Sequence, residues 1–151
     1  MTFDRALEKA MRYCSHQERC ILDLEKRFYD WNLPKNEWER VLNNLIKDDY
    51  LNQNRFIKAF VRGKFIIKKW GKNKIIVGLI AKGVYQEKLF NVVFNSEIGE
   101  EDYFKTINEL IHKKNQLINE TDKLKKRDKL YRYMLNKGFE SDLIVNALNF
   151  I

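Results

Sequence analysis

The chain has 151 residues, a mass of 18.3 kDa and a formal net charge of +8 at neutral pH. This length allows one ordinary domain or several small units that share a core, and it excludes a large multidomain enzyme. Six glycines and one proline leave little turn material for a sheet-rich fold, so an all-α fold is expected. Every apolar run is shorter than about 18 residues and the first residues do not resemble a signal peptide, so we expect no membrane segment and a cytoplasmic location.

The first third of the chain predicts three helices. Apolar residues recur at helical spacing over residues 3–13. Ser15 and Glu18 fit an S-x-x-E capping box, which predicts that a second helix begins at Ser15. Asn32 and Pro34 are typical of a helix end followed by a new helix start. The apolar positions of the third helix are Trp38, Val41, Leu42, Leu45 and Ile46.

Six further helices are predicted in the rest of the chain. Asn52 or Asn54 is a suitable cap for the first of them. Glu100, Glu101 and Asp102 precede another, where they stabilise the helix dipole rather than bind metal, because consecutive residues on a helix do not face one another. The predicted ranges are 54–69, 72–81, 85–94, 100 onward, 123–137 and 141–150.

Cys14 and Cys20 are the only cysteines, with His16 between them. These three residues lack the usual C-x2-C spacing of a zinc site, and His112 stands alone later in the chain. We therefore interpret the cysteines as small buried residues in a reducing compartment, and we expect neither a metal nor a cofactor.

Positive charge is concentrated in residues 55–88, which contain ten cations and one anion, Glu87. Any soluble helix exposes lysine and arginine, but a purely solvated face usually alternates them with glutamate at i,i+4 spacing. The near absence of carboxylates indicates that a polyanion or an acidic protein surface supplies the counter-charge. The residues expected to contact that partner are Arg55, Lys58, Arg62, Lys64, Lys68, Lys69, Lys72 and Lys74.

A helical projection of the helix predicted at 54–69 separates its charged and apolar residues. Arg55, Lys58, Arg62 and Lys69 fall within an arc of about 60°, at roughly 100° per residue. One face is therefore expected to bind and the other to pack. The packing face contains Phe56, Phe60, Gly63 and Ile67.

A second basic patch lies on the helix predicted at 123–137, where seven cations accompany the single anion Asp128. In contrast, residues 1–54 carry nine cations and ten anions, so the N-terminal part is not the electrostatic attractor. The contact residues expected in the second patch are Lys123, Lys125, Lys126, Arg127, Lys129 and Arg132.

An internal repeat organises the chain. Apolar residues around Asn32 recur around Gly83 at an offset of 51 residues, and again around Gly138 at a further offset of 55. The three equivalent positions hold residue types that accept positive φ at low cost. We therefore predict three tandem three-helix repeats, at 1–51, 52–99 and 100–151, stacked into an elongated, curved molecule.

The middle repeat resembles the RecX family. The run from Asp49 to Phe56 and the following Ala59-Phe60-Val61-Arg62 are similar to the family's GYLDDERFARAFVR segment, although Asp49 replaces its usual first glycine. Trp70-Gly71 and Lys82-Gly83-Val84 resemble its continuation, with Asn73 in place of a common proline. The resemblance implies a regulator that binds the RecA filament, commonly inhibits it, and also contacts DNA.

Four interpretations remain open, and the plainest of them is a helical scaffold whose positive charge is incidental. The first is a non-enzymatic regulator, expected as a monomer, that binds the RecA nucleoprotein filament. The second is a general DNA-binding helical module that does not depend on RecA. The third is an enzyme, which we do not expect because no phosphate-binding, dinucleotide-binding or zinc-protease motif is present.

Overall fold

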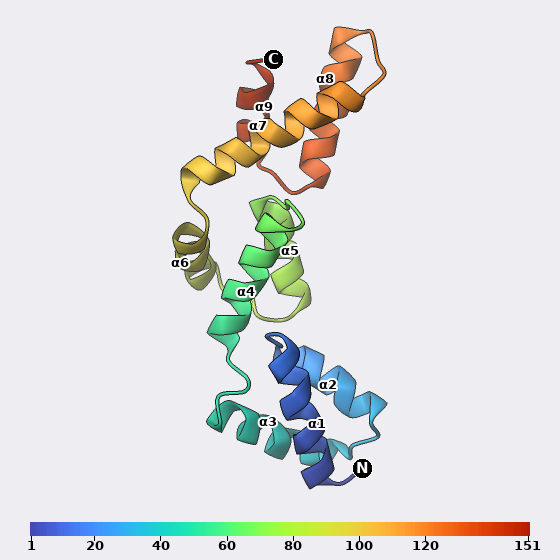
Figure 1. Cartoon of the computed structure of the whole chain (residues 1–151), viewed down its shortest axis with the longest axis vertical. Coiled ribbons are helices and arrows are strands. Elements are labelled where there is room, and N and C mark those ends of the chain that lie inside the picture. The colour runs from blue at the N-terminus through green and yellow to red at the C-terminus, as the bar shows by residue number, and fades with distance from the viewer. The chain divides into compact units, whose positions relative to one another are not determined.

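The computed structural model describes residues 1–151 and is all-α, as predicted (Figure 1). Two compact units form, one from residues 1–59 with 79–85 and the other from 60–78 with 86–151. No helix combines the length and the apolar character needed to cross a membrane. The elements are α1 (Phe3–His16), α2 (Ile21–Asp30), the 3₁₀ turn η1 (Lys35–Glu37), α3 (Trp38–Lys47), α4 (Gln53–Ile66), α5 (Lys72–Ala81), α6 (Glu87–Glu97), α7 (Glu100–Leu117), α8 (Lys123–Asn136) and α9 (Ser141–Leu148).

The three equivalent positions of the repeat have the same backbone conformation. Asn32, Gly83 and Gly138 follow α2, α5 and α8, and their φ angles are 57°, 73° and 97°. The next amide donates to a carbonyl one turn back in each case, which is the six-residue hydrogen bond of a Schellman motif. These bonds are Leu33 N to Phe28 O at 3.0 Å, Val84 N to Leu79 O at 3.1 Å, and Phe139 N to Met134 O at 3.2 Å. The predicted correspondence of residues is therefore confirmed.

Substitution of Asn32 by glycine is expected to stabilise the first unit by about 0.5–1 kcal/mol, because the left-handed conformation costs a non-glycine residue free energy. Gly83 and Gly138 already occupy the equivalent positions of the other repeats. Chemical denaturation of the Asn32→Gly variant measures the effect, and a loss of stability would show that the Asn32 side chain has another role.

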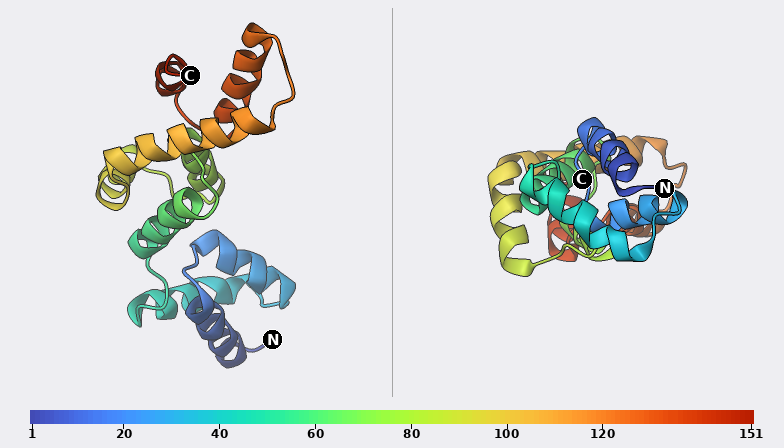
Figure 2. Two further views of the ribbon diagram at one scale, coloured as in Figure 1. Left: turned by 45° about the horizontal axis from the view of Figure 1, so that its top comes forward. Right: turned by 90° about the horizontal axis from the view of Figure 1, so that it is seen from below.

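The first unit packs α1, α2 and α3 around one hydrophobic core, and the three helices lie side by side in both views (Figures 1 and 2). Ala6 and Ala10 are fully buried on α1, where their small side chains allow close approach of α3. Phe28 packs between Trp31 and Trp38, with ring centroids 6.1 and 5.9 Å away.

The predicted start of the second helix is wrong. The first helix continues to His16, and the Ser15 hydroxyl donates to the Met11 carbonyl at 2.8 Å instead of capping a new helix. The second helix begins at Ile21, and the Cys20 amide donates to the Asp23 carboxylate at 3.1 Å. Asp23 therefore has the role that the sequence assigned to Glu18.

Asp23 is also held by a cation that follows α5 in the sequence. Lys82 Nζ donates to Asp23 Oδ1 at 2.7 Å. Burial alone would raise the pKa of Asp23, but hydrogen bonds from Lys82 and from Cys20 outweigh it and lower the pKa below its usual value. This pair connects the end of α5 to the start of α2 within the first unit.

Replacement of Asp23 by alanine is expected to lower the free energy of unfolding at pH 7 by about 2 kcal/mol, because it removes a helix cap and leaves Lys82 unpaired. The stabilising effect of a lowered pKa is complete above the unfolded value of about 3.9 and is lost as pH falls through the folded value. Denaturation from pH 7 to pH 2 should therefore show the difference between variant and wild type shrinking below about pH 4. Asp30→Ala on the same helix is the control, and an equal loss there would contradict the assignment.

Tyr103 on α7 is the centre of the second unit. Its ring lies 5.8 Å from Phe65, 5.5 Å from Phe94 and 5.5 Å from Phe139. Its hydroxyl donates to Glu140 and accepts from the Lys72 amide at 3.0 Å. Burial, and then the bond to Glu140, raise the pKa of Tyr103 well above its usual range. The first amide of α5 is thereby fixed to α7.

Candidate polyanion-binding surface

The guanidinium group of Arg55 forms ion pairs and hydrogen bonds with residues of the first unit. Its Nε donates to both Glu18 oxygens, at 3.0 and 3.2 Å, and its other nitrogens contact the Asp49 carboxylate at 2.9 Å and the Asp49 carbonyl at 2.8 Å. Asn52 caps the same helix by accepting from the Arg55 amide at 3.0 Å, as the sequence predicts for Asn52 or Asn54. The expectation that an external anion supplies the counter-charge does not hold for Arg55, which fixes α4 to the first repeat.

The other two cations of the predicted arc on α4 are more accessible. Lys58 is exposed and forms no ion pair. Arg62 lies 3.7 Å from Glu97, but its side chain is 60% exposed, and an ion pair of this kind contributes little to stability. Both side chains remain available to a partner.

The C-terminal end of α4 comes earlier than the helical projection assumed, since that projection extended the helix to Lys69. The helix ends at Ile66, and Lys69 has a left-handed backbone with φ of 58°. Lys69 therefore does not continue the arc of Arg55, Lys58 and Arg62. Ile67, which was expected on the packing face, is 76% exposed because it lies beyond the last helical turn.

Two lysines flank Trp70, the residue that follows this turn. Lys64 Nζ lies 4.8 Å from the Trp70 ring and Lys74 Nζ lies 4.7 Å from it. A cation–π contact of this kind orients an ammonium group without neutralising its charge. Gly78 makes room for the arrangement, because an added Cβ would lie 2.7 Å from Phe60 and 3.6 Å from Trp70.

The turn after Trp70 is bonded backbone to backbone with the turn after α8. The Gly71 amide donates to the Lys137 carbonyl at 2.7 Å, and the Asn73 amide donates to the Gly138 carbonyl at 2.9 Å. A Cβ on Gly71 would lie 2.4 Å from Gly138, and one on Gly138 would lie 2.3 Å from Lys74. Only glycine at both positions permits this approach.

This contact brings Lys137 next to the predicted cations. Lys137 Nζ donates to the Lys68 carbonyl at 3.0 Å. Burial, and then the charge of Lys74, lower the pKa of Lys137 below its usual value. The sequence analysis counted Lys137 among the seven cations of the helix predicted at 123–137 but did not include it among the contact residues. We call this set the lysine junction, and it consists of Lys64, Lys68, Lys69, Lys72, Lys74 and Lys137.

The lysine junction has no internal counter-charge. None of its six ammonium groups lies within 4.0 Å of a carboxylate oxygen, and residues 50–86 contain no Asp or Glu. Lys72 and Lys74 also occupy the first turn of α5, where the helix dipole disfavours cations. The arrangement therefore costs stability unless an external anion binds.

The second basic patch lies on α8. Asp122 caps this helix by accepting from the Leu124 and Lys125 amides at 2.9 and 3.1 Å. Lys129 contacts Glu120 at 3.3 Å, and Arg127 donates to the Asn149 side chain at 2.8 Å. The remaining cations of the patch form no ion pair. These are Lys123, Lys125, Lys126 and Arg132.

Cys14 and Cys20 are both buried and reduced. Burial is the main cause that raises the pKa of Cys14 to about 11 and also raises the pKa of Cys20. Thiols with raised pKa values are poor nucleophiles and poor metal ligands at neutral pH. No group of three or more His, Cys, Asp or Glu side chains in the chain is arranged to hold a metal ion.

These features define a helical-repeat protein with a cationic junction and a second cationic helix. The sequence pattern of the domain described as "RecX, third three-helix domain" matches residues 100–148. The chain is 34% identical over 103 residues to the regulatory protein RecX of Clostridium acetobutylicum. The matched region covers 67% of this chain and 47% of that protein. The chain is 26% identical over 145 residues to the regulatory protein RecX of Clostridioides difficile, and this match covers 96% of the chain and 67% of that protein. The chain belongs to the RecX family of regulatory proteins.

The fold agrees with that assignment. The crystal structure of RecX from Lactobacillus salivarius superposes with a TM-score of 0.81 at 20% identity, covering 99% of this chain and 97% of the other. The chain spans about half to two thirds of the length of the clostridial relatives that it matches.

Proposed function

We propose that this chain binds the RecA nucleoprotein filament and modulates its recombinase and ATPase activities, with inhibition as the expected direction. The observation that carries the proposal is the lysine junction, whose six ammonium groups have no carboxylate partner in a RecX-family fold. A filament of protein and DNA presents phosphates and acidic side chains at high density, which is the counter-charge that the junction lacks. Arg62 and the cations of α8 provide further contacts to the same assembly.

The test is a titration of the cognate RecA with the purified protein. DNA-dependent ATP hydrolysis and strand exchange by RecA are measured together at rising concentrations of the chain. The expected result is that both activities change in a saturable manner and in the same direction. Activities that stay constant at a tenfold molar excess over RecA would refute the proposal.

A general DNA-binding module is the second candidate, and the exposed cations of α8 favour it. It requires that affinity for DNA be the same with and without RecA, and that affinity fall with salt by about 0.9 logarithmic units per phosphate contacted. Under this alternative, RecA would be affected only when the protein competes for bare DNA. Saturating the DNA with RecA in advance would then abolish the effect on ATP hydrolysis.

A further inference from the structure

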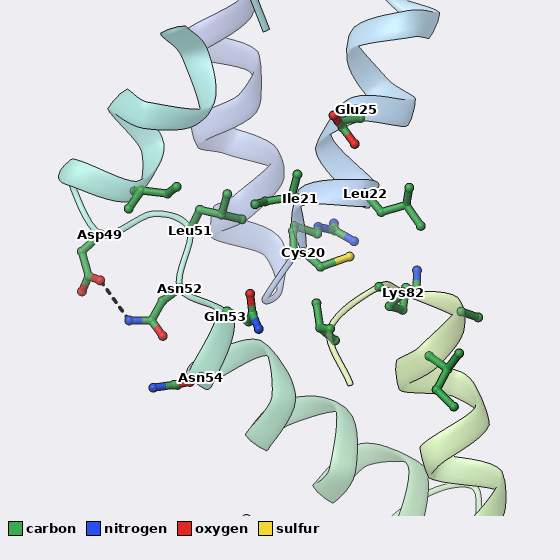
Figure 3. Close-up of a pocket in the computed structure, with 16 residues that line it drawn as sticks. Cys20, Ile21, Leu22, Glu25, Asp49, Leu51, Asn52, Gln53, Asn54 and Lys82 are labelled. Carbon is green, nitrogen blue, oxygen red and sulfur yellow. Dashed lines mark hydrogen bonds between the residues drawn. The ribbon is translucent and has the colours of Figure 1, made fainter. Parts of the chain in front are cut away.

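A cavity of about 600 Å³ opens in the first unit, far in sequence from the cations of α8 (Figure 3). Residues from the starts of α2 and α4, from the end of α3 and from the end of α5 line it. Cys20 and Leu51, which are both buried, lie along its inner wall, as Figure 3 shows. Three of the lining residues have the structural contacts described above: Asp49 pairs with Arg55, Asn52 caps α4, and Lys82 pairs with Asp23. No residue of the lysine junction and no cation of α8 lines the cavity.

Exposed apolar side chains from three helices line the cavity. Ile21 on α2, Ile46 on α3 and Ile80 on α5 are 43%, 50% and 57% exposed, and all three line it. A single exposed isoleucine is common on protein surfaces. Three that converge from separate helices on one hollow, with Leu22 beside them, form a contiguous patch of the kind that binds a partner.

The rim of the cavity is polar and electrically balanced. Arg19 and Lys82 carry positive charge, while Glu25 and Asp49 carry negative charge. Lys82 is bonded to Asp23, and Asp49 to Arg55. A rim with equal numbers of positive and negative side chains does not attract a polyanion such as a nucleic acid. A molecule that binds in this cavity is therefore expected to be mainly neutral.

Two side chains at the mouth suit a peptide backbone. Gln53 and Asn54, labelled in Figure 3, are exposed, and their carboxamides are bonded to no other residue of the chain. A carboxamide offers both a donor and an acceptor, which is the requirement for pairing with a peptide group. Apolar walls beside free carboxamides match an extended segment whose side chains enter the hollow and whose backbone lies along the rim.

We propose that this cavity docks a short, uncharged and apolar segment of the protein component of the filament. The inference rests on the proposed function, to which it adds a contact that is chemically distinct from the lysine junction. The junction binds through charge and weakens with salt, whereas the cavity binds through apolar burial and selects protein over DNA.

The first experiment measures binding of the double variant Ile46→Glu, Ile80→Glu to RecA filaments and to bare single-stranded DNA. Affinity for the filament is expected to fall at least tenfold, and affinity for bare DNA is expected to stay within twofold of wild type. The control is Val92→Glu, Leu117→Glu, since these side chains are 67% and 77% exposed and do not line the cavity. Circular dichroism establishes that both variants are folded.

The possible results of this binding experiment distinguish failure of the docking site from failure of the proposed function. Equal filament affinity for the cavity variant and wild type overturns the docking site and leaves the proposed function intact. Failure of wild type to bind the filament removes the proposed function together with the docking site. A wild-type dimer that the cavity variant converts to monomer in sedimentation would show that a second copy of the chain fills the cavity, which also overturns the proposal.

A second experiment locates the occupant directly. An Ile46→Cys variant is labelled with a benzophenone maleimide, which is selective because Cys14 and Cys20 are buried and have raised pKa values. Irradiation with RecA filaments is expected to crosslink the label to an apolar RecA peptide, identified by mass spectrometry. Crosslinks to DNA alone, or crosslinks no more frequent than those from a labelled Val92→Cys variant, would contradict the proposal.

Discussion

Simultaneous replacement of Lys68, Lys72 and Lys74 by glutamate is expected to weaken binding to the RecA filament about 100-fold at 0.1 M salt. These lysines belong to the lysine junction and have no internal carboxylate partner, so reversal removes attraction and adds repulsion. If each lysine contacts one phosphate of single-stranded DNA, the salt dependence of log affinity becomes shallower by about 2.1. Binding titrations at several salt concentrations measure both quantities.

The same variant is expected to be at least as stable as wild type. Lys72 and Lys74 occupy the first turn of α5, where glutamate interacts favourably with the helix dipole and lysine does not. Glutamate at position 74 also relieves the repulsion that lowers the pKa of Lys137. The matched control is Arg5→Glu, Lys26→Glu, Lys47→Glu, which changes the net charge by the same amount within the first repeat. Equal loss of binding in that control would show that total charge matters and the lysine junction does not.

The second large effect is expected at the glycine contact between the turns after α4 and α8. Gly71→Ala places a Cβ 2.4 Å from the Gly138 and Phe139 backbone and disrupts two backbone hydrogen bonds. Overpacking together with the lost hydrogen bonds costs about 3 kcal/mol, which corresponds to a fall in Tm of roughly 6–12 °C. Gly138→Ala is expected to cost still more, because its φ of 97° adds backbone strain.

Gly63 supplies the matched control for this prediction. It lies inside α4, and an added Cβ would meet nothing within 4 Å. Gly63→Ala is therefore expected to stabilise the protein by about 0.5–1 kcal/mol, because alanine is the better helix former. Differential scanning calorimetry of the three variants makes the comparison. A neutral Gly71→Ala substitution would show that the two turns separate readily in solution.

The fold could be predicted from the sequence because the signals that end each helix depend on residues close together in the chain. Asn32, Gly83 and Gly138 stand at the same point of the apolar pattern, and a Schellman turn depends only on residues within about six positions. Helix α5 was predicted with its observed bounds for the same reason, since Trp70-Gly71 precedes it and Lys82-Gly83 follows it.

The errors arose where a local motif was ambiguous. Ser15 and Glu18 have the spacing of a capping box, but apolar burial of Cys14 extends α1 past Ser15. Cysteine is not a typical cap residue, so nothing in the local pattern predicted a helix start at Cys20. The helical projection of α4 failed at Ile67 and Lys69 because the helix ends at Ile66.

The site was readable only in part, because its decisive contacts join residues far apart in sequence. The partners of Arg55 include Glu18, which is 37 residues away, so a count of nearby carboxylates overstated the free charge of α4. Lys137 reaches Lys68 across 69 residues, and only the contact between Gly71 and Gly138 brings them together. The cavity between Ile21, Ile46 and Ile80 has no signature in sequence, since each isoleucine belongs to an ordinary amphipathic helix.

We propose that the uncompensated lysine junction binds a RecA–DNA assembly and not DNA in general. The most direct measurement is the affinity of the wild-type chain for three targets at one salt concentration, namely the RecA filament on single-stranded DNA, the same DNA without RecA, and RecA without DNA. We predict that the filament binds at least tenfold more tightly than either component, and that the lysine reversal removes this preference. Equal affinity for the filament and for the bare DNA would contradict the account.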